Sequence, residues 1–108
     1  MSSLSTHVLD IELGAPAAGL AVALYQDDRC LAQAVTDSNG RIANLGAGDL
    51  NEGVYCLVFD VAAYLLAQGR AAPFLRRVSV EFGLEAVQAH YHVPLLMTAY
   101  ACSTYRGS

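Results

Sequence analysis

Short apolar runs that alternate at every second residue, separated by turn residues, constrain the fold of this chain most. Leu20–Gln26 shows the pattern clearly: Leu20, Val22 and Leu24 fall on one face and the intervening residues on the other. Such alternation is typical of strands with one buried face. The DSNG segment of residues 37–40 is a strong turn signal, because Asn and Gly tolerate positive φ. The chain is therefore predicted to be built from antiparallel strands.

The same criteria predict eight strands, with loops at Gly14–Pro16 and Gly46–Gly48. These strands are Leu4–Asp10, Leu20–Gln26, Leu31–Thr36, Arg41–Asn44, Val54–Phe59, Phe74–Phe82, Ala86–Leu96 and Thr98–Arg106. A short helix follows Asp60, which can cap it, and Gly69 is placed to end it. Eight short strands with one brief helix predict an all-β sandwich, in a single domain of residues 1–108.

The composition indicates that the chain self-associates. Hydrophobic residues make up 55% of its 108 residues and charged residues only 15%. A domain of this size leaves much of its chain at the surface, and large exposed apolar patches are rare on soluble monomers. We therefore expect a homo-oligomer with an apolar subunit interface.

Cys30, Cys56 and Cys102 are an odd number of cysteines without the CxxC spacing of metal or redox motifs. They stand among apolar residues, so we expect buried, reduced thiols and a reducing compartment. The N-terminal sequence lacks the basic and apolar regions of a secretory signal. These observations predict a cytoplasmic protein.

Two classes of partner are not expected. The longest uncharged run, residues 87–105, is interrupted by polar side chains and Pro94, so it does not have the pattern of a membrane span. A formal net charge of −4 provides no basic surface for nucleic acid.

The histidines are the candidate chemical groups. His90 and His92 are two residues apart, so on a strand they project from the same face. Histidine takes and returns protons near neutral pH. Arg41 follows the DSNG turn, either as a solvated loop residue or as a fixed cation for carbonyl or anionic oxygens. Together with His7 the pair could supply three nitrogens to zinc, but the spacing does not fix where His7 lies, and we expect no metal and no organic cofactor.

Four stretches of the chain resemble a known family. They are LSTHVLD (residues 4–10), DSNGRI (37–42), HYHVPLL (90–96) and STYRGS (103–108). Together they are similar to the signatures of the 5-hydroxyisourate hydrolases, the enzymatic relatives of transthyretin. The likeness continues through GVYCLVFDVAAY and PFLRRVSVEF, so that it covers nearly the whole chain. The ending STYRGS is the most specific part, because the hormone-carrying transthyretins lack it.

The resemblance implies a transthyretin-like sandwich of two four-stranded sheets with one short helix, assembled as a homotetramer with active sites where subunits meet. It implies hydrolysis of 5-hydroxyisourate, the product of urate oxidation, to 2-oxo-4-hydroxy-4-carboxy-5-ureidoimidazoline on the way to allantoin. The family's catalytic positions correspond to His7, Arg41, His92 and Ser108. Tyr105 would join these residues in binding substrate. The role of His90 and the choice of general base stay open.

The chain departs from the family pattern in one place. The family usually has Ser-Pro and Gly-Tyr pairs where this chain has Thr98-Ala99 and Ala101-Cys102. These departures alter the turn into the last strand and put substrate affinity or turnover in question. The alternative function is that of a non-catalytic, transthyretin-like carrier of a small ligand.

Overall fold

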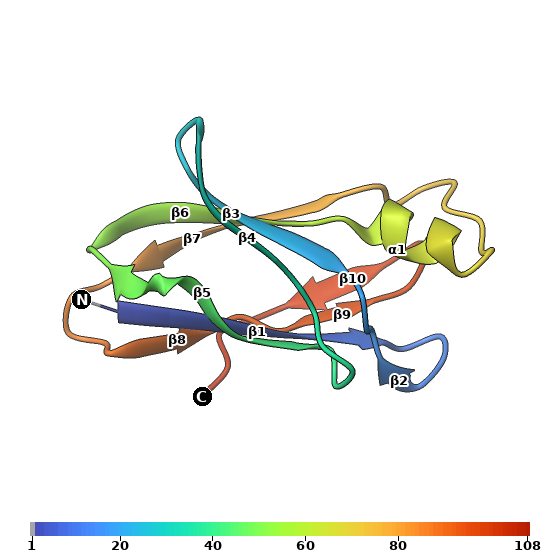
Figure 1. The fold of residues 1–108 in the computed structure, drawn as a ribbon, viewed down its shortest axis with the longest axis horizontal. Helices are drawn as coiled ribbons and strands as arrows, with labels where there is room; N and C mark the ends of the chain where they lie inside the picture. The colour runs from blue at the N-terminus through green and yellow to red at the C-terminus, as the bar shows by residue number, and fades with distance from the viewer. Residues whose placement is uncertain (1) are drawn as a thin grey trace.

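A computed structural model of the protein describes residues 2–108, with only the backbone of residues 47–49; Met1 lies outside this range. Within it the chain forms ten strands and one helix (Figure 1). In chain order these are β1 (Ser2–Asp10), β2 (Ala15–Pro16), β3 (Ala21–Gln26), β4 (Arg29–Val35), β5 (Arg41–Leu50), β6 (Gly53–Phe59), α1 (Val61–Ala67), β7 (Val78–Leu84), β8 (His90–His92), β9 (Leu95–Met97) and β10 (Cys102–Thr104).

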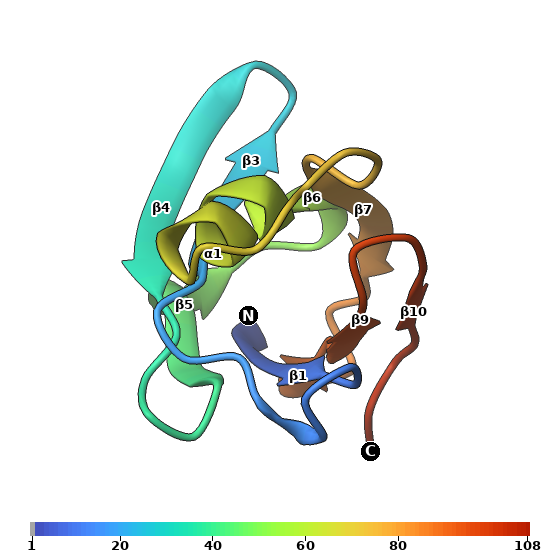
Figure 2. The same cartoon turned by 90° about the vertical axis from the view of Figure 1, so that its right-hand side faces the viewer.

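The strands form two sheets that face each other, and α1 closes one end of the sandwich (Figures 1 and 2). The second sheet has four strands in the order β4-β3-β6-β7. The first sheet is organised around β1, which pairs with β5 and β8 along its first half and with β9 and β2 along its second. β10 continues this sheet beyond β9. The predicted all-β sandwich is confirmed, although the first sheet counts six strands rather than four.

Two-residue alternation produces the core, as the sequence predicts. Along β1 buried and half-buried residues alternate without exception, with Leu4 and Val8 facing inward. The predicted inward face of the second strand is confirmed, because Leu20, Val22 and Leu24 are almost completely buried. The outward face of β1, which includes His7, is therefore free to take part in a site.

The helix begins and ends as predicted. The Asp60 carboxylate accepts a hydrogen bond from the Ala63 N–H at 3.1 Å, which is the N-cap interaction. After the helix, Gly69 adopts a φ of +71°, and the N–H of Arg70 donates to the Leu65 carbonyl at 3.0 Å. This left-handed glycine turns the chain so that Arg70 points back toward β1.

Arg70 forms an ion pair with Asp10 at the end of β1. The Asp10 side chain has no solvent exposure, and its Oδ2 accepts hydrogen bonds from Arg70 Nη1 at 2.6 Å and from the Tyr64 hydroxyl at 2.8 Å. Burial raises the pKa of Asp10, but the hydrogen bonds from Arg70, Tyr64 and the Leu13 N–H outweigh it and hold that pKa below its ordinary value. The ionised carboxylate thus fastens the helix end to the first sheet.

The predicted strand Phe74–Phe82 begins too early. The backbone groups of its first residues form hydrogen bonds with residues outside β6, the strand that pairs with β7. The Leu75 N–H donates to the Ala99 carbonyl at 3.2 Å, and the Arg76 carbonyl accepts from the Ala62 N–H at 2.8 Å. β7 therefore starts at Val78. Phe74, the first residue of the predicted strand, is 65% exposed.

The predicted strand Ala86–Leu96 is two short strands, β8 and β9. Pro94 has no N–H to donate and separates them. The Val93 N–H nevertheless donates to the Ser5 carbonyl at 3.0 Å, and both short strands keep the same parallel register along β1.

The remaining differences are at strand ends. β5 continues past the predicted loop to Leu50, pairing with β1 through register irregularities. β2 is a two-residue strand where a loop was predicted, and β10 is limited to Cys102–Thr104. Thr98 shortens that last strand, because its Oγ1 accepts the N–H groups of Tyr100 and Ala101 at 3.0 and 2.9 Å and closes a tight turn.

The prediction of three buried thiols is wrong. Cys30 and Cys102 are exposed in the single chain and Cys56 is partly buried, and all three are free. Cys30 lies in the β3–β4 hairpin, whose tip extends beyond the rest of the sandwich (Figure 1), and Cys102 lies on the last strand of its sheet. Apolar residues next to a cysteine in the sequence therefore do not show whether its side chain is buried in the fold. Across the described residues, no helix has the length and apolar character needed to cross a membrane.

Candidate functional site

The predicted catalytic residues meet on the outward face of the first sheet. In the antiparallel β1–β5 pair His7 lies opposite Arg41. In the parallel β1–β8 pair Ser5 lies opposite His92. Residues paired across neighbouring strands project from the same face. The central position of β1 therefore brings an arginine from one side and a histidine from the other to the same surface.

His92 is held through one ring nitrogen. Its Nδ1 lies 2.8 Å from the Ser5 hydroxyl oxygen. This hydrogen bond fixes the orientation of the ring and leaves Nε2 as the nitrogen available to a ligand. The sequence indicates His92 but not Ser5, because only the strand register shows that they are neighbours.

Arg41 is positioned by the DSNG turn. The Asp37 carboxylate accepts hydrogen bonds from the N–H groups of Asn39 at 2.8 Å and Arg41 at 3.0 Å. These backbone hydrogen bonds hold the pKa of Asp37 below its ordinary value. Gly40 has a φ of +74°, and a Cβ there would stand 2.4 Å from the Val8 carbonyl oxygen. The turn thus requires glycine at this position, both for its backbone conformation and for its close contact with β1.

The C-terminal segment covers His92. The Gly107 N–H donates to the His92 carbonyl at 2.7 Å, and the two residues form a β-bridge. A Cβ on Gly107 would stand 2.6 Å from Cδ2 of the His92 ring. Glycine therefore allows the backbone to lie directly against the imidazole, which places Ser108 beside it.

Together these elements line a hollow of about 590 Å³, within the roughly 300–1,000 Å³ range of small-molecule sites. Arg41, His92 and Ser108 line it, and His7 lies next to it in the β1–β5 register. Its full lining is Ser5, Thr6, Asp37, Arg41, Ile42, Ala43, His90, His92 and Ser108. Tyr105 lines a different, smaller hollow between β7, β8 and the C-terminal segment. Its predicted substrate contact is therefore not made within this pocket of the single chain.

The surroundings of His92 favour its neutral form. Burial lowers the pKa of His92 first, and the nearby charges of Arg41, His7 and His90 lower it further. At neutral pH the ring is therefore ready to accept a proton. A neutral imidazole with one free nitrogen, next to a guanidinium, can activate a water molecule and stabilise a developing negative charge.

Within the described part of the chain, the histidines do not belong to a metal site. Among the side chains that the structure describes, no three from His, Cys, Asp or Glu converge closely enough to hold a metal ion. His90 and His92 instead direct ring nitrogens to serine hydroxyls.

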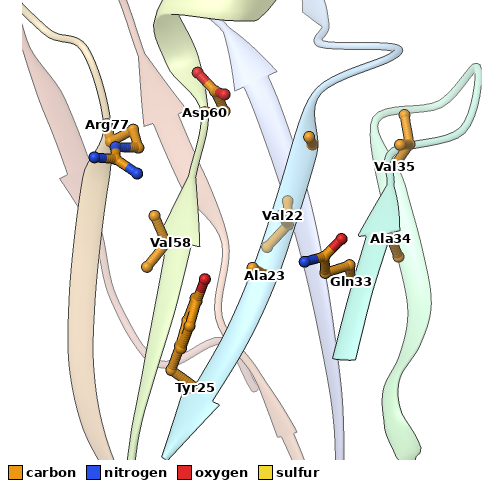
Figure 3. A pocket seen from close by; sticks show the side chains of 10 residues that line it. Val22, Ala23, Tyr25, Gln33, Ala34, Val35, Val58, Asp60 and Arg77 are labelled. Carbon is orange, nitrogen blue, oxygen red and sulfur yellow. The ribbon is translucent and has the colours of Figure 1, made fainter. Parts of the chain in front are cut away.

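A second hollow, of about 440 Å³, lies on the outward face of the other sheet (Figure 3). Its polar side chains include Gln33, Asp60 and Arg77, together with the Tyr25 hydroxyl. Its lining contains no histidine or cysteine, so it lacks the proton-transfer groups gathered at the first hollow.

Comparisons with known proteins show the family to which the chain belongs. The sequence profile of the HIUase/Transthyretin family matches residues 4–107. The chain belongs to this family. A 5-hydroxyisourate hydrolase from Halalkalibacterium halodurans is 44% identical to it over 97% of each chain. The solved structure of the Klebsiella pneumoniae 5-hydroxyisourate hydrolase superposes with a TM-score of 0.92 at 42% identity, covering 100% of both chains.

Transthyretins share the fold as well. The structure of transthyretin from Sparus aurata superposes with a TM-score of 0.87 at 31% identity, over 96% of this chain and 95% of that one. The sandwich alone therefore does not separate hydrolases from transthyretins within the family.

The departures from the family pattern lie away from that hollow. The turn from Thr98 to Ala101 follows β9, whose Met97 pairs with Asp10 at the far end of β1. His92 pairs instead with Ser5. The Thr98 hydroxyl closes this turn without a proline or a glycine in it.

Proposed function

We propose that this protein is a 5-hydroxyisourate hydrolase, which opens the six-membered ring of its substrate to form 2-oxo-4-hydroxy-4-carboxy-5-ureidoimidazoline. The observation that supports it most is the convergence of His92, Arg41 and Ser108 at one hollow, with His7 opposite Arg41 on β1, in a chain whose relatives bear that enzyme name. The reaction belongs to the degradation of urate.

His92 is the proposed general base. Its Nδ1 is engaged by Ser5, so Nε2 takes the proton from a water molecule that attacks the lactam carbonyl. The depressed pKa of His92 keeps the ring neutral at physiological pH, as a base requires. A positioned general base typically contributes about 10²–10⁴-fold to a rate.

Arg41 is the proposed electrostatic partner. Its guanidinium binds substrate oxygens and stabilises the negative charge that develops as water adds to the carbonyl. His7, opposite Arg41 on β1, binds and orients the substrate. Ser108 closes the hollow beside His92. Tyr105 stays a predicted substrate-binding residue.

We further propose a homotetramer. β7 and β10 are the last strands of their sheets and are open to pairing with another chain. Several large apolar side chains are exposed, among them Val87 at 90% and Phe74 at 65%. Light scattering should give four times the chain mass of 11.4 kDa, and a monomeric mass would refute this assembly. The exposed free thiols of Cys30 and Cys102 fit a reducing compartment, so we propose the cytoplasm as its location.

Two substitutions test the function. His92→Ala and Arg41→Glu should each nearly abolish the accelerated decay of freshly generated 5-hydroxyisourate, followed by absorbance with urate oxidase supplying the substrate. Arg77→Glu is the matched control, because Arg77 lines the hollow on the other sheet (Figure 3). Parent-like rates in both site variants would refute the assignment, and a folded oligomer in every variant excludes loss of structure as the cause.

A further inference from the structure

We propose that Ser5 is a positioning residue that joins His92 and His90 into one proton path, along which the charge gained at the active site passes to the surface. The inference rests on the proposed hydrolase function and assigns a role to two residues outside the predicted catalytic set. It depends on four side chains of two neighbouring strands, Ser3, Ser5, His90 and His92.

The geometry is a continuous chain of hydrogen bonds. The Ser5 Oγ lies 2.8 Å from Nδ1 of His92 and 2.9 Å from Nε2 of His90. On its other side, His90 Nδ1 lies 2.5 Å from the Ser3 Oγ. The parallel β1–β8 register creates this arrangement, because it pairs Ser3 with His90 and Ser5 with His92 on the same face.

A serine hydroxyl has one hydrogen, which makes the two rings depend on each other. Ser5 can donate to only one of the two imidazoles and accepts from the other. When Ser5 donates to His90 Nε2, it accepts from His92 Nδ1–H, and His92 Nε2 is free to act as a base. When Ser5 donates to His92 Nδ1, the His92 proton stands on Nε2. The tautomer of His92 therefore depends on the tautomer of His90, because Ser5 links the two rings.

The proton transfer balances along this path. His92 begins with its proton on Nδ1, and Nε2 takes a proton from the attacking water. The Nδ1 proton then passes to Ser5 Oγ as the Ser5 hydroxyl proton passes to His90 Nε2. His90, which already holds a proton on Nδ1, becomes the imidazolium. His92 is left neutral with its proton on Nε2. As that proton passes to the departing ring nitrogen, His90 returns its Nε2 proton to Ser5 Oγ and the Ser5 hydroxyl proton returns to His92 Nδ1, so that both imidazoles end neutral.

The charges around the two rings favour this direction. His92 is partly buried and shares its surroundings with Arg41 and His7, which oppose a second positive charge there. His90 is exposed, and water stabilises its charged form. Asp37, the acidic side chain of the hollow, lies on the turn that holds Arg41. Moving the charge from His92 to His90 thus carries it away from the guanidinium and toward solvent.

Substitutions separate this role from simple packing. Ser5→Ala should lower kcat by about 2- to 12-fold, the range expected for one neutral hydrogen bond, with little change in KM. Ser5→Thr keeps the hydroxyl and should restore most of the rate. His90→Phe should lower kcat similarly, and the double variant should be no slower than the single ones, because both break the same path. Ser79→Ala, at an exposed position on β7, is the matched control.

A second measurement needs no substrate. The nitrogen NMR signals of the imidazoles distinguish the two tautomers, and we expect those of His90 and His92 to change in common steps as pH is varied in the parent protein. In Ser5→Ala the two rings should titrate independently. Independent rings in an active parent protein, or additive rate losses in the double variant, would overturn the role of Ser5. Coupled rings in a folded parent without activity would instead refute the proposed function.

Discussion

Gly107 offers the sharpest test of how the C-terminal segment shapes the site. In Gly107→Ala the new Cβ would stand 2.6 Å from Cδ2 of His92 and 3.3 Å from its Cβ and Cγ. Carbon atoms pack best at about 3.5–4.0 Å, so the ring or the backbone must move by roughly 1 Å. A displacement of this size at a reacting group can cost about 10²-fold in rate. We expect kcat to fall by about 10- to 100-fold, with the larger loss if the ring moves.

The assay is the decay of freshly generated 5-hydroxyisourate, measured beside the thermal unfolding midpoint of each variant. Gly83→Ala is the matched control, because a Cβ at Gly83 would meet nothing within 4 Å. Neither glycine has a positive φ, so backbone strain does not enter the comparison. If Gly107→Ala kept a kcat within twofold of the parent while folded, the inferred contact with His92 would not matter for catalysis.

The pH profile of kcat/KM should fall as pH drops through the pKa of His92, which burial and then Arg41 hold below 6.5, and a rate unchanged down to pH 5 would argue against a neutral His92 as the base. Asp10→Ala should lower the free energy of unfolding measured in urea by about 3 kcal/mol, because it leaves Arg70 without its buried partner. The parent protein should lose this contribution in acid, as pH falls through the lowered pKa of Asp10. An unchanged urea midpoint in Asp10→Ala would contradict the anchoring role of this ion pair. Thr98→Ala should cost about 1–2 kcal/mol by removing the hydrogen bonds of the turn while leaving kcat unchanged, and a large loss of kcat would show that this turn affects the active site after all.

The local alternation of apolar residues is sufficient to predict the strands that have one buried face and one exposed face. Leu20–Gln26 and Val54–Phe59 alternate between core and surface, and the structure follows that alternation. The start of β7 was not predictable in this way, since the backbone hydrogen bonds of Leu75 and Arg76 go to residues distant in the sequence. The solvent exposure of the cysteine side chains could not be predicted for a related reason. It depends on which strands lie at the edges of the sheets.

The candidate site likewise has a part that the sequence predicts and a part that only the strand pairing shows. Spacing alone places His90 and His92 on one face, whereas the position of Arg41 after the DSNG turn leaves open whether it is a solvated loop residue or a fixed cation. That His7 lies opposite Arg41, and Ser5 opposite His92, follows only from the register of β1 with its two neighbours. Register between strands far apart in sequence is set by the packing of the whole sandwich, which local alternation does not specify.

The central claim is that this hollow hydrolyses 5-hydroxyisourate. The most direct measurement follows the absorbance of freshly generated 5-hydroxyisourate with the parent protein added, with the His92→Ala variant added, and with no protein. We predict accelerated decay with the parent alone, and decay near the spontaneous rate in the other two samples. Decay at the spontaneous rate with folded parent protein, or equal acceleration by His92→Ala, would contradict the assignment.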